Sequence, residues 1–275
     1  MQPSELKQRP VGISVVIPTY NRLNEVLRAI ESVHSIRPTD VEIIVVDDGS
    51  ADDPRPHLPA FNASLIRIRV FRFEINRGPQ SARNMGIRRA RFSHIAFLDS
   101  DDEFTDDKVD TILMEIENRD FDLLFHAVRG MPRYDRLATF WDRRLRKLLP
   151  FHWLCAVYNP VITPALVVRR KCRLGLTRLR HCEDWAFLLR YVEAGLAVRY
   201  LREELALVHR PIGSSGGLSA AIWKMRKGEF KARKVLLRKA KAGNVARWCA
   251  GSIAGLTRVV VDLFRGRYWQ HRSPD

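Results

Sequence analysis

A cluster of acidic residues follows a short apolar run in the middle of the chain. The run from Ile95 to Leu98 leads directly into Asp99, Asp101 and Asp102. Carboxylates placed this close repel one another and raise one another's pKa unless a cation shares them. Oxygen ligands suit a hard divalent cation such as Mg2+ or Mn2+, which keeps coordination positions open for phosphate oxygens. The cluster therefore predicts a metal site, and a solvated turn that caps a helix is the alternative.

Two upstream apolar runs also end in polar residues. Residues 13–22 are halted at Pro18, and residues 41–50 end in Asp47 and Asp48. Continuous apolar runs bounded by turn residues are typical of strands that are buried on both faces of a parallel sheet. Apolar residues at helical spacing lie between the runs, so strands and helices are expected to alternate. Ligands of such sheets bind beyond the carboxyl ends of the strands, and the three polar clusters should therefore line one crevice.

Several short motifs in fixed order carry a resemblance to a known enzyme family. They are PTYNR from residue 18, VVDDGS from residue 45, NRGPQSARNMGI from residue 76, LDSDD from residue 98 and CEDWAFLLR from residue 182. In this order and spacing they resemble a family 2 glycosyltransferase, and the resemblance covers roughly residues 11–215. It implies an α/β fold of the GT-A type, with a Rossmann-like, mixed and mostly parallel sheet flanked by helices. It also implies transfer of a sugar from a nucleotide donor.

The resemblance assigns a set of donor-binding residues. Tyr20 would stack on the nucleobase, Asp48 would accept the uracil imide N–H, and Arg83 would contact the donor phosphate or base. For the two aspartates of VVDDGS the alternative is a turn and helix cap, and for Arg83 it is an ordinary surface arginine. The full set is Pro18, Thr19, Tyr20, Asn21, Asp47, Asp48, Arg83, Asp99 and Ser100.

The resemblance also implies a divalent cation, Mn2+ or Mg2+, as cofactor. Asp101 would be the direct ligand, and Asp99 would contact the metal shell or the ribose. Some relatives place a histidine or arginine against the metal or diphosphate, which makes His209 a further metal ligand and Arg210 a second candidate. A lone histidine is more often structural, and that remains the alternative for His209. The cation would neutralise the charge of the departing nucleoside diphosphate.

A pair of acids opens a strongly amphipathic segment near residue 183. A helix start favours carboxylates through its partial positive charge, so Glu183 and Asp184 could be a plain acidic first turn. By resemblance to the family's ED motif, Asp184 is the general base that takes the acceptor proton, and Glu183 contacts the acceptor. General base catalysis on the face opposite the leaving group implies an inverting reaction.

Length and composition set the expected organisation. With 275 residues and 46% hydrophobic residues, the chain can bury a sizeable core. We expect an N-terminal extension over 1–12, a GT-A catalytic domain over 13–219, and a basic amphipathic helical tail over 220–275. Within the catalytic domain, residues 13–118 would bind the nucleotide sugar, and residues 119–219 would hold the acceptor and the base.

Three further segments have distinctive compositions. Residues 150–168 lack charge but contain three prolines, and they are expected to form an irregular buried segment. The four cysteines show neither a CxxC pair nor histidines at zinc spacing, so reduced thiols are expected. The Gly/Ser-rich stretch from Ser214 to Ser219 would suit a lid that excludes water.

The tail concentrates the positive charge of the chain. Residues 220–275 carry 14 basic and 3 acidic residues, and thus +11 of the net charge of +16. Helical spacing places five residues on one narrow face of a wide apolar helix, namely Arg247, Gly251, Gly255, Arg258 and Asp262. Such a helix is expected to lie on an anionic membrane surface, and packing on the catalytic domain is the alternative. Without a signal peptide or spanning run, the predicted location is cytoplasmic and peripheral, on the inner face of the plasma membrane.

Two other classes of function compete with sugar transfer. A net charge of +16 and a pI near 10.3 also fit a nucleic-acid-binding protein, but that function gives no reason for acids at three strand ends. A sugar nucleotidyltransferase would also bind a metal ion at the end of a similar sheet, but the first strand here leads into PTYN rather than a Gly-rich phosphate loop. We therefore expect a metal-assisted, inverting glycosyltransferase and no nucleic-acid partner. It would transfer from a UDP-sugar to a saccharide or lipid-linked saccharide in cell-surface polysaccharide biosynthesis.

Overall fold

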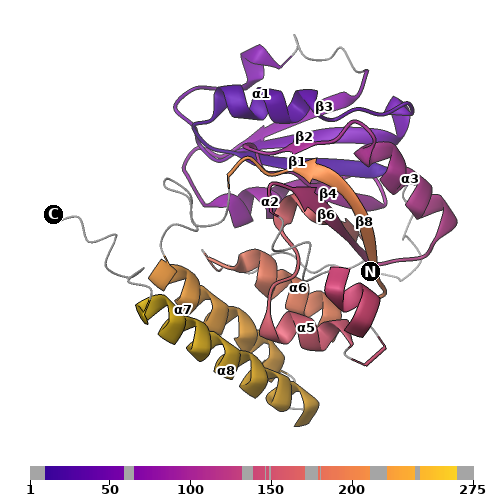
Figure 1. Ribbon diagram of the computed structural model, residues 1–275. Coiled ribbons are helices and arrows are strands. Elements are labelled where there is room, and N and C mark those ends of the chain that lie inside the picture. The colour runs from indigo at the N-terminus through magenta and orange to yellow at the C-terminus, as the bar shows by residue number, and fades with distance from the viewer. Residues whose placement is uncertain are drawn as a thin grey trace, which may run out of the picture.

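One mixed sheet organises the computed structural model, which describes residues 10–58, 65–131, 139–145, 147–148, 150–170, 179, 181–210, 222–238 and 242–264. The strands are β1 (Ile13–Thr19), β2 (Val41–Asp47), β3 (Arg67–Arg72), β4 (His94–Phe97), β5 (Glu103–Phe104), β6 (Leu123–Arg129), β7 (Leu166–Arg169) and β8 (Val198–Leu207). Their order in the sheet is β3-β2-β1-β4-β7-β6-β8-β5 (Figure 1). The first four strands run parallel, whereas β7 and β5 are antiparallel to their neighbours. The predicted α/β fold class is thus confirmed.

Helices cover both faces of this sheet. They are α1 (Leu23–Glu31), α2 (Pro79–Arg89), α3 (Lys108–Asn118), α5 (Phe151–Val157), α6 (Glu183–Glu193), α7 (Ile222–Arg233) and α8 (Ala242–Phe264). Short 3-10 or π turns occur at η1 (Pro38–Asp40), η2 (Arg55–His57), η4 (Trp141–Leu145), η5 (Thr163–Ala165) and η7 (Lys234–Arg238). α1 and α3 pack on one face, and α2 and α6 on the other (Figure 1).

Alternation along the central strands divides the core into two layers. In β2, Ile43 and Val45 face the helices α1 and α3, whereas Ile44 and Val46 face α2 and α6. Because both faces are covered, every residue of β1 and β2 is buried. This explains why these strands are continuous apolar runs in the sequence.

The predicted strands and their polar ends are located close to where the sequence places them. β1 and β2 fill the first seven positions of the runs 13–22 and 41–50, and the remaining residues form the loops that follow. β4 spans His94–Phe97, one residue earlier than the run Ile95 to Leu98. Three strands therefore deliver polar residues to one edge of the sheet.

The expectation of irregular structure over residues 150–168 is wrong. The helix α5 begins directly after Pro150, whose backbone is extended, and ends before Pro160. Proline is tolerated at a helix boundary because the first turn needs no N–H from it. Cys155 and Ala156 on this helix are completely buried, and Leu166 begins β7.

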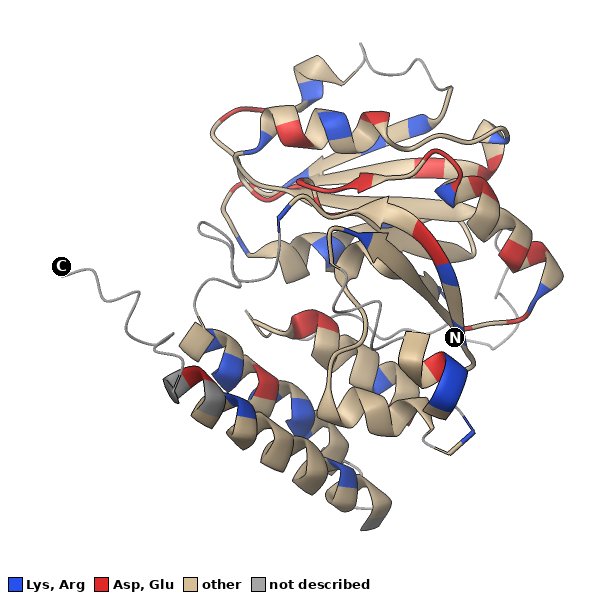
Figure 2. Ribbon diagram, viewed as in Figure 1, with Lys and Arg blue, Asp and Glu red and all other residues tan. Residues whose placement is uncertain are grey.

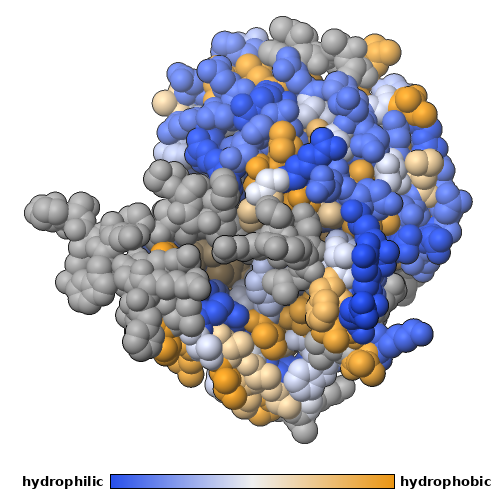
Figure 3. Space-filling model, viewed as in Figure 1, coloured by the Kyte–Doolittle hydropathy of each residue, from blue (hydrophilic) through white to orange (hydrophobic). Residues whose placement is uncertain are grey.

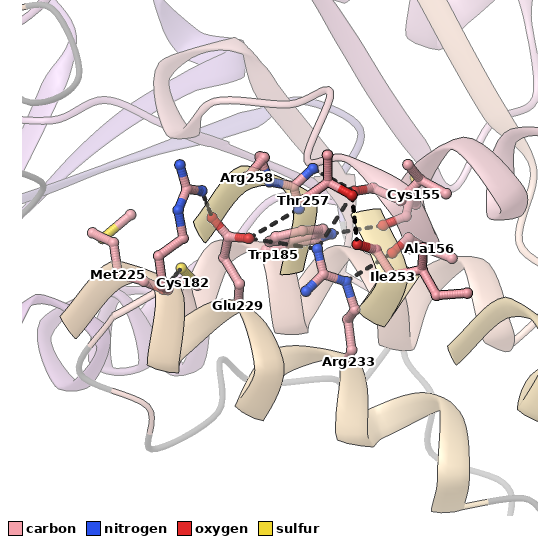
Figure 4. A network of polar contacts seen from close by, with 12 residues as sticks. Cys155, Ala156, Cys182, Trp185, Met225, Glu229, Arg233, Ile253, Thr257 and Arg258 are labelled. Atoms are coloured by element: carbon pink, nitrogen blue, oxygen red, sulfur yellow. Dashed lines mark hydrogen bonds and ion pairs between the residues drawn. The ribbon is translucent and has the colours of Figure 1, made fainter. Parts of the chain in front are cut away.

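The two C-terminal helices pack against α5 and α6 through a polar network (Figure 4). Arg233 of α7 is fully buried, donates from Nε to the carbonyl of Ala156 at 2.9 Å, and lies over the ring of Trp185. Arg258 of α8 pairs with Glu229 of α7 at 2.9 Å. A buried guanidinium is costly unless carbonyls and carboxylates surround it, so this network specifies how the helices dock.

The narrow polar face of α8 is the face that turns inward. Asp262 is 3% exposed and pairs with Arg226 at 2.6 Å, and Arg247 pairs with Glu193 of α6. Arg226 and Arg247 are thus neutralised by acids of the same chain. This arrangement agrees with the alternative expectation, in which the tail packs on the catalytic domain. Among the helices that the structure describes, none is both long enough and apolar enough to cross a membrane.

Gly251 permits the close approach of α8, and its replacement is predicted to unseat the helix. A Cβ at this position would lie 2.2 Å from the carbonyl oxygen of Ala156. Gly251→Ala should therefore lower the free energy of unfolding by about 1–3 kcal/mol, despite alanine's higher helix propensity. Gly243→Ala in the same helix is the control, because its Cβ would meet nothing within 4 Å. Urea unfolding that gives equal stability for the two variants would contradict this packing.

Burial of His94 is expected to make the free energy of unfolding sensitive to acid. Burial, and secondarily the charge of Arg169, lower the pKa of His94 to about 4. The unfolded histidine takes up a proton below about pH 6.5, so stability is complete above that pH and is lost as the pH falls towards 4, by about 3 kcal/mol in total. His94→Leu should remove this loss, whereas replacement of the exposed His57 should not. Urea midpoints at pH 4, 5, 6 and 7 would measure the difference, and parallel profiles for wild type and His94→Leu would contradict it.

Candidate active site

The carboxyl ends of β1 and β2 form the floor of the candidate site. Thr19 and Asp47 are paired in register across the two strands, and the carbonyl of Thr19 accepts the N–H of Asp48 at 2.8 Å. The adjacent β4 continues into Leu98, whose N–H donates to Val16 of β1 at 3.1 Å. The three polar clusters therefore converge on one edge, as the sequence predicts.

The loop after β1 is held by residues of the loop after β2. The N–H of Asn21 donates to Ser50 Oγ at 2.8 Å, and Asn21 Oδ1 accepts the N–H of Ala51 at 2.9 Å. Asn21 has φ of 51°, a left-handed conformation that asparagine tolerates. Tyr20 beside it is 45% exposed, so its ring is open to a stacking partner. Asp47 is fully buried and accepts from the backbone and hydroxyl of Ser50, which fixes the same loop.

Asp48 organises the start of α2. Its two carboxylate oxygens accept the N–H groups of Arg77 and Gly78, each at 2.8 Å. Gly78 has φ of 87°, which the turn into α2 requires. Burial raises the pKa of Asp48, although these two hydrogen bonds oppose the shift. The carboxylate is thus built into the turn. A nucleobase N–H could be accepted only by the lone pairs that these two hydrogen bonds leave unused.

Arg83 joins the acids of LDSDD to the acids of the ED motif. Nη2 lies 2.5 Å from Asp99 Oδ1, and Nη1 lies 2.8 Å from Glu183 Oε1. The side chain is buried, and the nearby carboxylates raise its pKa even though burial opposes this. The alternative of a surface arginine is therefore wrong. The structure places Arg83 as a buried bridge between two carboxylates.

The ED motif forms the first turn of α6, and unusual backbone precedes it. Cys182 has φ of 57°, a left-handed conformation that is strained for a residue with a Cβ. Asp184 Oδ2 accepts from Asn159 Nδ2 at 3.1 Å. Burial raises the pKa of Glu183 to about 7 against the opposing charge of Arg83, and it raises the pKa of Asp184. Both shifts make these carboxylates more basic than exposed ones, and Glu183 can take up a proton near neutral pH.

The predicted metal ligands are not grouped. Asp99 is engaged by Arg83, Asp101 Oδ2 pairs with Arg22 at 2.5 Å, and His209 Nε2 lies 2.6 Å from Glu103. Within the described parts of the chain, no three His, Cys, Asp or Glu side chains lie close enough to hold an ion. Asp101 still fits a hard cation chemically, because its carboxylate is partly exposed and its side-chain contacts with described residues use Oδ2 alone.

The last acid of LDSDD has a structural role. Asp102 is 5% exposed, and its Oδ1 accepts the main-chain N–H of His209 at 3.2 Å. Burial, together with the charges of Asp99 and Asp101, raises the pKa of Asp102 to about 8. Ser100 is also buried. Asp102 is therefore neither solvated nor a helix cap, since β5 follows it and Asp107 precedes α3. It ties the LDSDD loop to the residue that follows β8.

Sequence reasoning missed two residues of this site. Arg22, which lies inside the PTYNR motif, pairs with Asp101, and Asn159 holds Asp184. The motif itself was a signal for Arg22, but nothing in the uncharged segment 150–168 marks Asn159. The predicted lid from Ser214 to Ser219 lies outside the described residues.

Comparison with known sequences identifies the family. Residues 14–172 match Glycosyl transferase family 2. The chain is 34% identical over 220 residues to an uncharacterized glycosyltransferase of Haemophilus influenzae, covering 77% of this chain and 85% of that protein. It is 40% identical over 111 residues to the succinoglycan biosynthesis protein ExoO of Rhizobium meliloti, covering 40% of this chain and 30% of that protein. It spans only 16–18% of the length of the Rickettsia glycosyltransferases that it matches.

Solved structures share the fold at low sequence identity. Residues 1–349 of S. aureus TarS, in complex with UDP-GlcNAc, superpose with a TM-score of 0.64 at 17% identity, covering 90% of this chain and 73% of that one. The mannosyltransferase PcManGT from Pyrobaculum calidifontis, in complex with GDP-Man and Mn2+, gives a TM-score of 0.66 at 13% identity, covering 95% and 82%. Together with the family match, this shows that the chain belongs to glycosyl transferase family 2 and has the GT-A fold.

Proposed function

We propose that the protein is an inverting glycosyltransferase that moves a sugar from a UDP-linked donor to a hydroxyl of a saccharide or lipid-linked saccharide. One observation carries the proposal: Arg83 contacts Asp99 at 2.5 Å and Glu183 at 2.8 Å. The strand-end acids and the ED helix therefore lie close together. Donor-binding groups and a candidate base would reach the same sugar carbon from these two elements, as direct displacement requires.

The donor would be gripped along the ends of β1 and β2. Tyr20 offers an exposed ring to the base, while Asn21 and Asp48 belong to loops that their own hydrogen bonds already hold. Such pre-organised loops lose little conformational freedom on binding, which favours affinity. The two solved neighbours carry UDP-GlcNAc and GDP-Man, so the fold accepts more than one nucleotide. The choice of UDP here rests on the resemblance, which assigns Asp48 to the uracil imide.

Asp184 would act on the acceptor. Its described hydrogen-bond partners are neutral, namely the amide of Asn159 and the backbone N–H of Trp185, whereas Glu183 is held by the guanidinium of Arg83. Of the two carboxylates, Asp184 is therefore freer to accept a proton from a hydroxyl. Its pKa is raised by burial, which increases its basicity. Glu183 would orient the acceptor beside it.

A divalent cation is part of the proposal, and Asp101 is the residue that would hold it. When bound, the cation would stabilise negative charge on the departing diphosphate as a Lewis acid. Arg22 and Arg210 flank the same carboxylate at 2.5 and 3.9 Å, so they would contribute positive charge at the same edge. Mn2+ is present in the structure of PcManGT, which favours the same class of ion here. His209 is a weaker candidate because Glu103 engages it.

The proposed setting is assembly of a cell-surface polysaccharide at the inner face of the plasma membrane. The similarity to a succinoglycan biosynthesis protein supports the polysaccharide part of this setting, and the membrane part rests on the composition of the tail.

A donor panel tests the proposal. Thermal unfolding would be followed with UDP-, GDP- and dTDP-linked sugars, each with and without Mn2+. A ligand present at about 100 times its Kd should stabilise the native state by about 2.7 kcal/mol, and we expect this from a UDP-sugar with Mn2+. Asp48→Ala should lose the shift, whereas Asp52→Asn, which changes an exposed acid a few residues away, should keep it. A protein that no nucleotide sugar stabilises would contradict the proposal.

A further inference from the structure

The outward face of α8 is an uncovered apolar stripe. Because the narrow polar face turns inward, the opposite face projects Val245, Cys249, Ile253, Leu256 and Val260 at spacings of three or four residues. Ile253 is 65% exposed and Leu256 57% exposed. In Figure 3, apolar surface gathers along the lower left edge, where Figure 1 places α8. We call these five residues the α8 stripe.

A row of lysines lies on the neighbouring helix. Lys224, Lys227 and Lys231 of α7, followed by Lys234, are all exposed at spacings of three or four residues, and none pairs with a described acid. We call these four residues the lysine row. The arginines of α7 behave oppositely, since Arg226 and Arg233 are turned inward to acids and carbonyls. The helix thus separates its cations into an inner set that builds the fold and an outer set that pairs with none of the described acids.

The two features lie on neighbouring helices. α7 and α8 lie side by side (Figure 2) and are joined by the pairs Arg226 with Asp262 and Arg258 with Glu229. Each helix buries the face towards the rest of the protein, so both features lie on the outer surface of the helix pair. Trp223, which is 53% exposed with Lys227 5.2 Å from its ring centroid, adds an aromatic group to this surface.

We propose that this surface, formed by the α8 stripe and the lysine row, binds an anionic lipid bilayer. The α8 stripe would be buried at the boundary between headgroups and acyl chains, and the lysine row would contact lipid phosphates. Lysine suits this use because its long stem lets the ammonium remain in the headgroup region while the helix lies deeper. The inference rests on the proposed membrane setting and names the faces involved. The polar face of α8 packs inward, so the apolar face is the one that would contact the membrane.

Charge favours lipid over a second copy of the chain. A symmetric dimer through the α8 stripe would bring two lysine rows close together, and like charges at such an interface oppose association. The tail has few acids to compensate, and Glu229 and Asp262 are already paired. An anionic bilayer meets both features at once.

Vesicle partition tests the inference on the full chain. Cys249 is the exposed cysteine on the α8 stripe, whereas Cys155 and Cys182 are buried, so an environment-sensitive fluorophore can be attached there in a Cys172→Ser background. Titration with phosphatidylcholine vesicles that contain phosphatidylglycerol should shift the emission to the blue, and sedimentation should give the partition coefficient of the unlabelled protein. Replacing Ile253 and Leu256 by Glu should lower the partition coefficient at least about tenfold.

Two sets of variants provide the controls. Replacing Lys224, Lys227 and Lys231 by Gln should reduce binding by about tenfold or more on anionic vesicles, with little effect on pure phosphatidylcholine, and should weaken the salt dependence. Replacing Ile36 and Leu65 by Glu, two exposed apolar residues far along the chain from the tail, should change nothing. UDP release from the donor in vesicle-free solution is measured in parallel, because failure of the proposed reaction would leave the partition result standing.

Three outcomes would overturn the inference. The wild-type protein could fail to partition onto anionic vesicles, or it could partition equally well after both sets of substitutions. Sedimentation velocity could instead show a dimer that the Ile253 and Leu256 replacements dissociate, which would assign the α8 stripe to a second copy of the chain.

Discussion

Asp184→Asn is expected to reduce sugar transfer by about 100-fold to 10,000-fold while donor affinity stays unchanged. The amide has the shape of the carboxylate and can still accept from Asn159 Nδ2, which now lies 3.1 Å from Asp184 Oδ2. It cannot accept the proton of the acceptor hydroxyl. The effect should therefore appear in kcat, and a nucleotide-release assay with acceptor in excess would measure it.

Comparison with Glu183→Gln separates the two acids of the motif. Glu183 is paired with Arg83, so its replacement should disturb acceptor placement and stability and leave a residual transfer activity well above that of Asp184→Asn. The pH profile gives a second readout. Because burial raises the pKa of Asp184, wild-type kcat should fall as the pH decreases through that raised value. Turnover by Asp184→Asn near the wild-type level would eliminate Asp184 as the base.

Arg83→Met is expected to lower the free energy of unfolding by about 3–5 kcal/mol and to abolish transfer. Methionine fills similar space but leaves Glu183 buried without its cation, and it leaves Asp99 beside Asp101 and Asp102 without the charge that now holds it. A buried carboxylate without a partner is costly and can relieve the cost by taking up a proton. The destabilisation should therefore be smaller at low pH than at neutral pH. Urea unfolding at pH 5 and pH 8 would test this.

An exposed pair supplies the control for Arg83. Arg55 pairs with Asp53 at 2.5 Å on the surface, and Arg55→Met should cost less than about 1 kcal/mol because water screens such pairs. The double variant Arg83→Met/Glu183→Gln should recover part of the stability lost in Arg83→Met, since it removes one of the stranded charges. A loss below about 1 kcal/mol in Arg83→Met would contradict the bridging role.

The sheet and its polar edge were predictable because the apolar pattern of each strand reflects its position in the centre of the sheet. A strand buried on both faces must be apolar throughout, and the polar residues at its carboxyl end then mark the crevice. Thr19 and Asp47 illustrate this, since each lies at the predicted carboxyl end of its run, and the structure pairs the two residues across β1 and β2. The ED motif was equally accessible, because the apolar spacing of α6 fixes Glu183 and Asp184 in its first turn.

Other features depend on partners that sequence spacing does not encode. From its spacing, Arg83 could equally face solvent, a phosphate or two carboxylates, and only the tertiary positions of Asp99 and Glu183 decide. The pair of Arg22 with Asp101 joins residues 79 positions apart. In α8, Gly251 and Gly255 allow close approach to Arg233, so the polar face packs inward, a choice that amphipathic spacing alone leaves open. The prolines around α5 similarly mark its boundaries, although they resemble breaks in an irregular segment.

The central claim is that Asp184 deprotonates an acceptor hydroxyl for direct displacement of the nucleoside diphosphate. The anomeric configuration of the transferred sugar tests this most directly, and the proton coupling constant at the anomeric carbon of the product reports it. An α-linked nucleotide sugar should give a β-linked product, because a single displacement inverts the reacting carbon. A product that retains the α configuration would contradict the account.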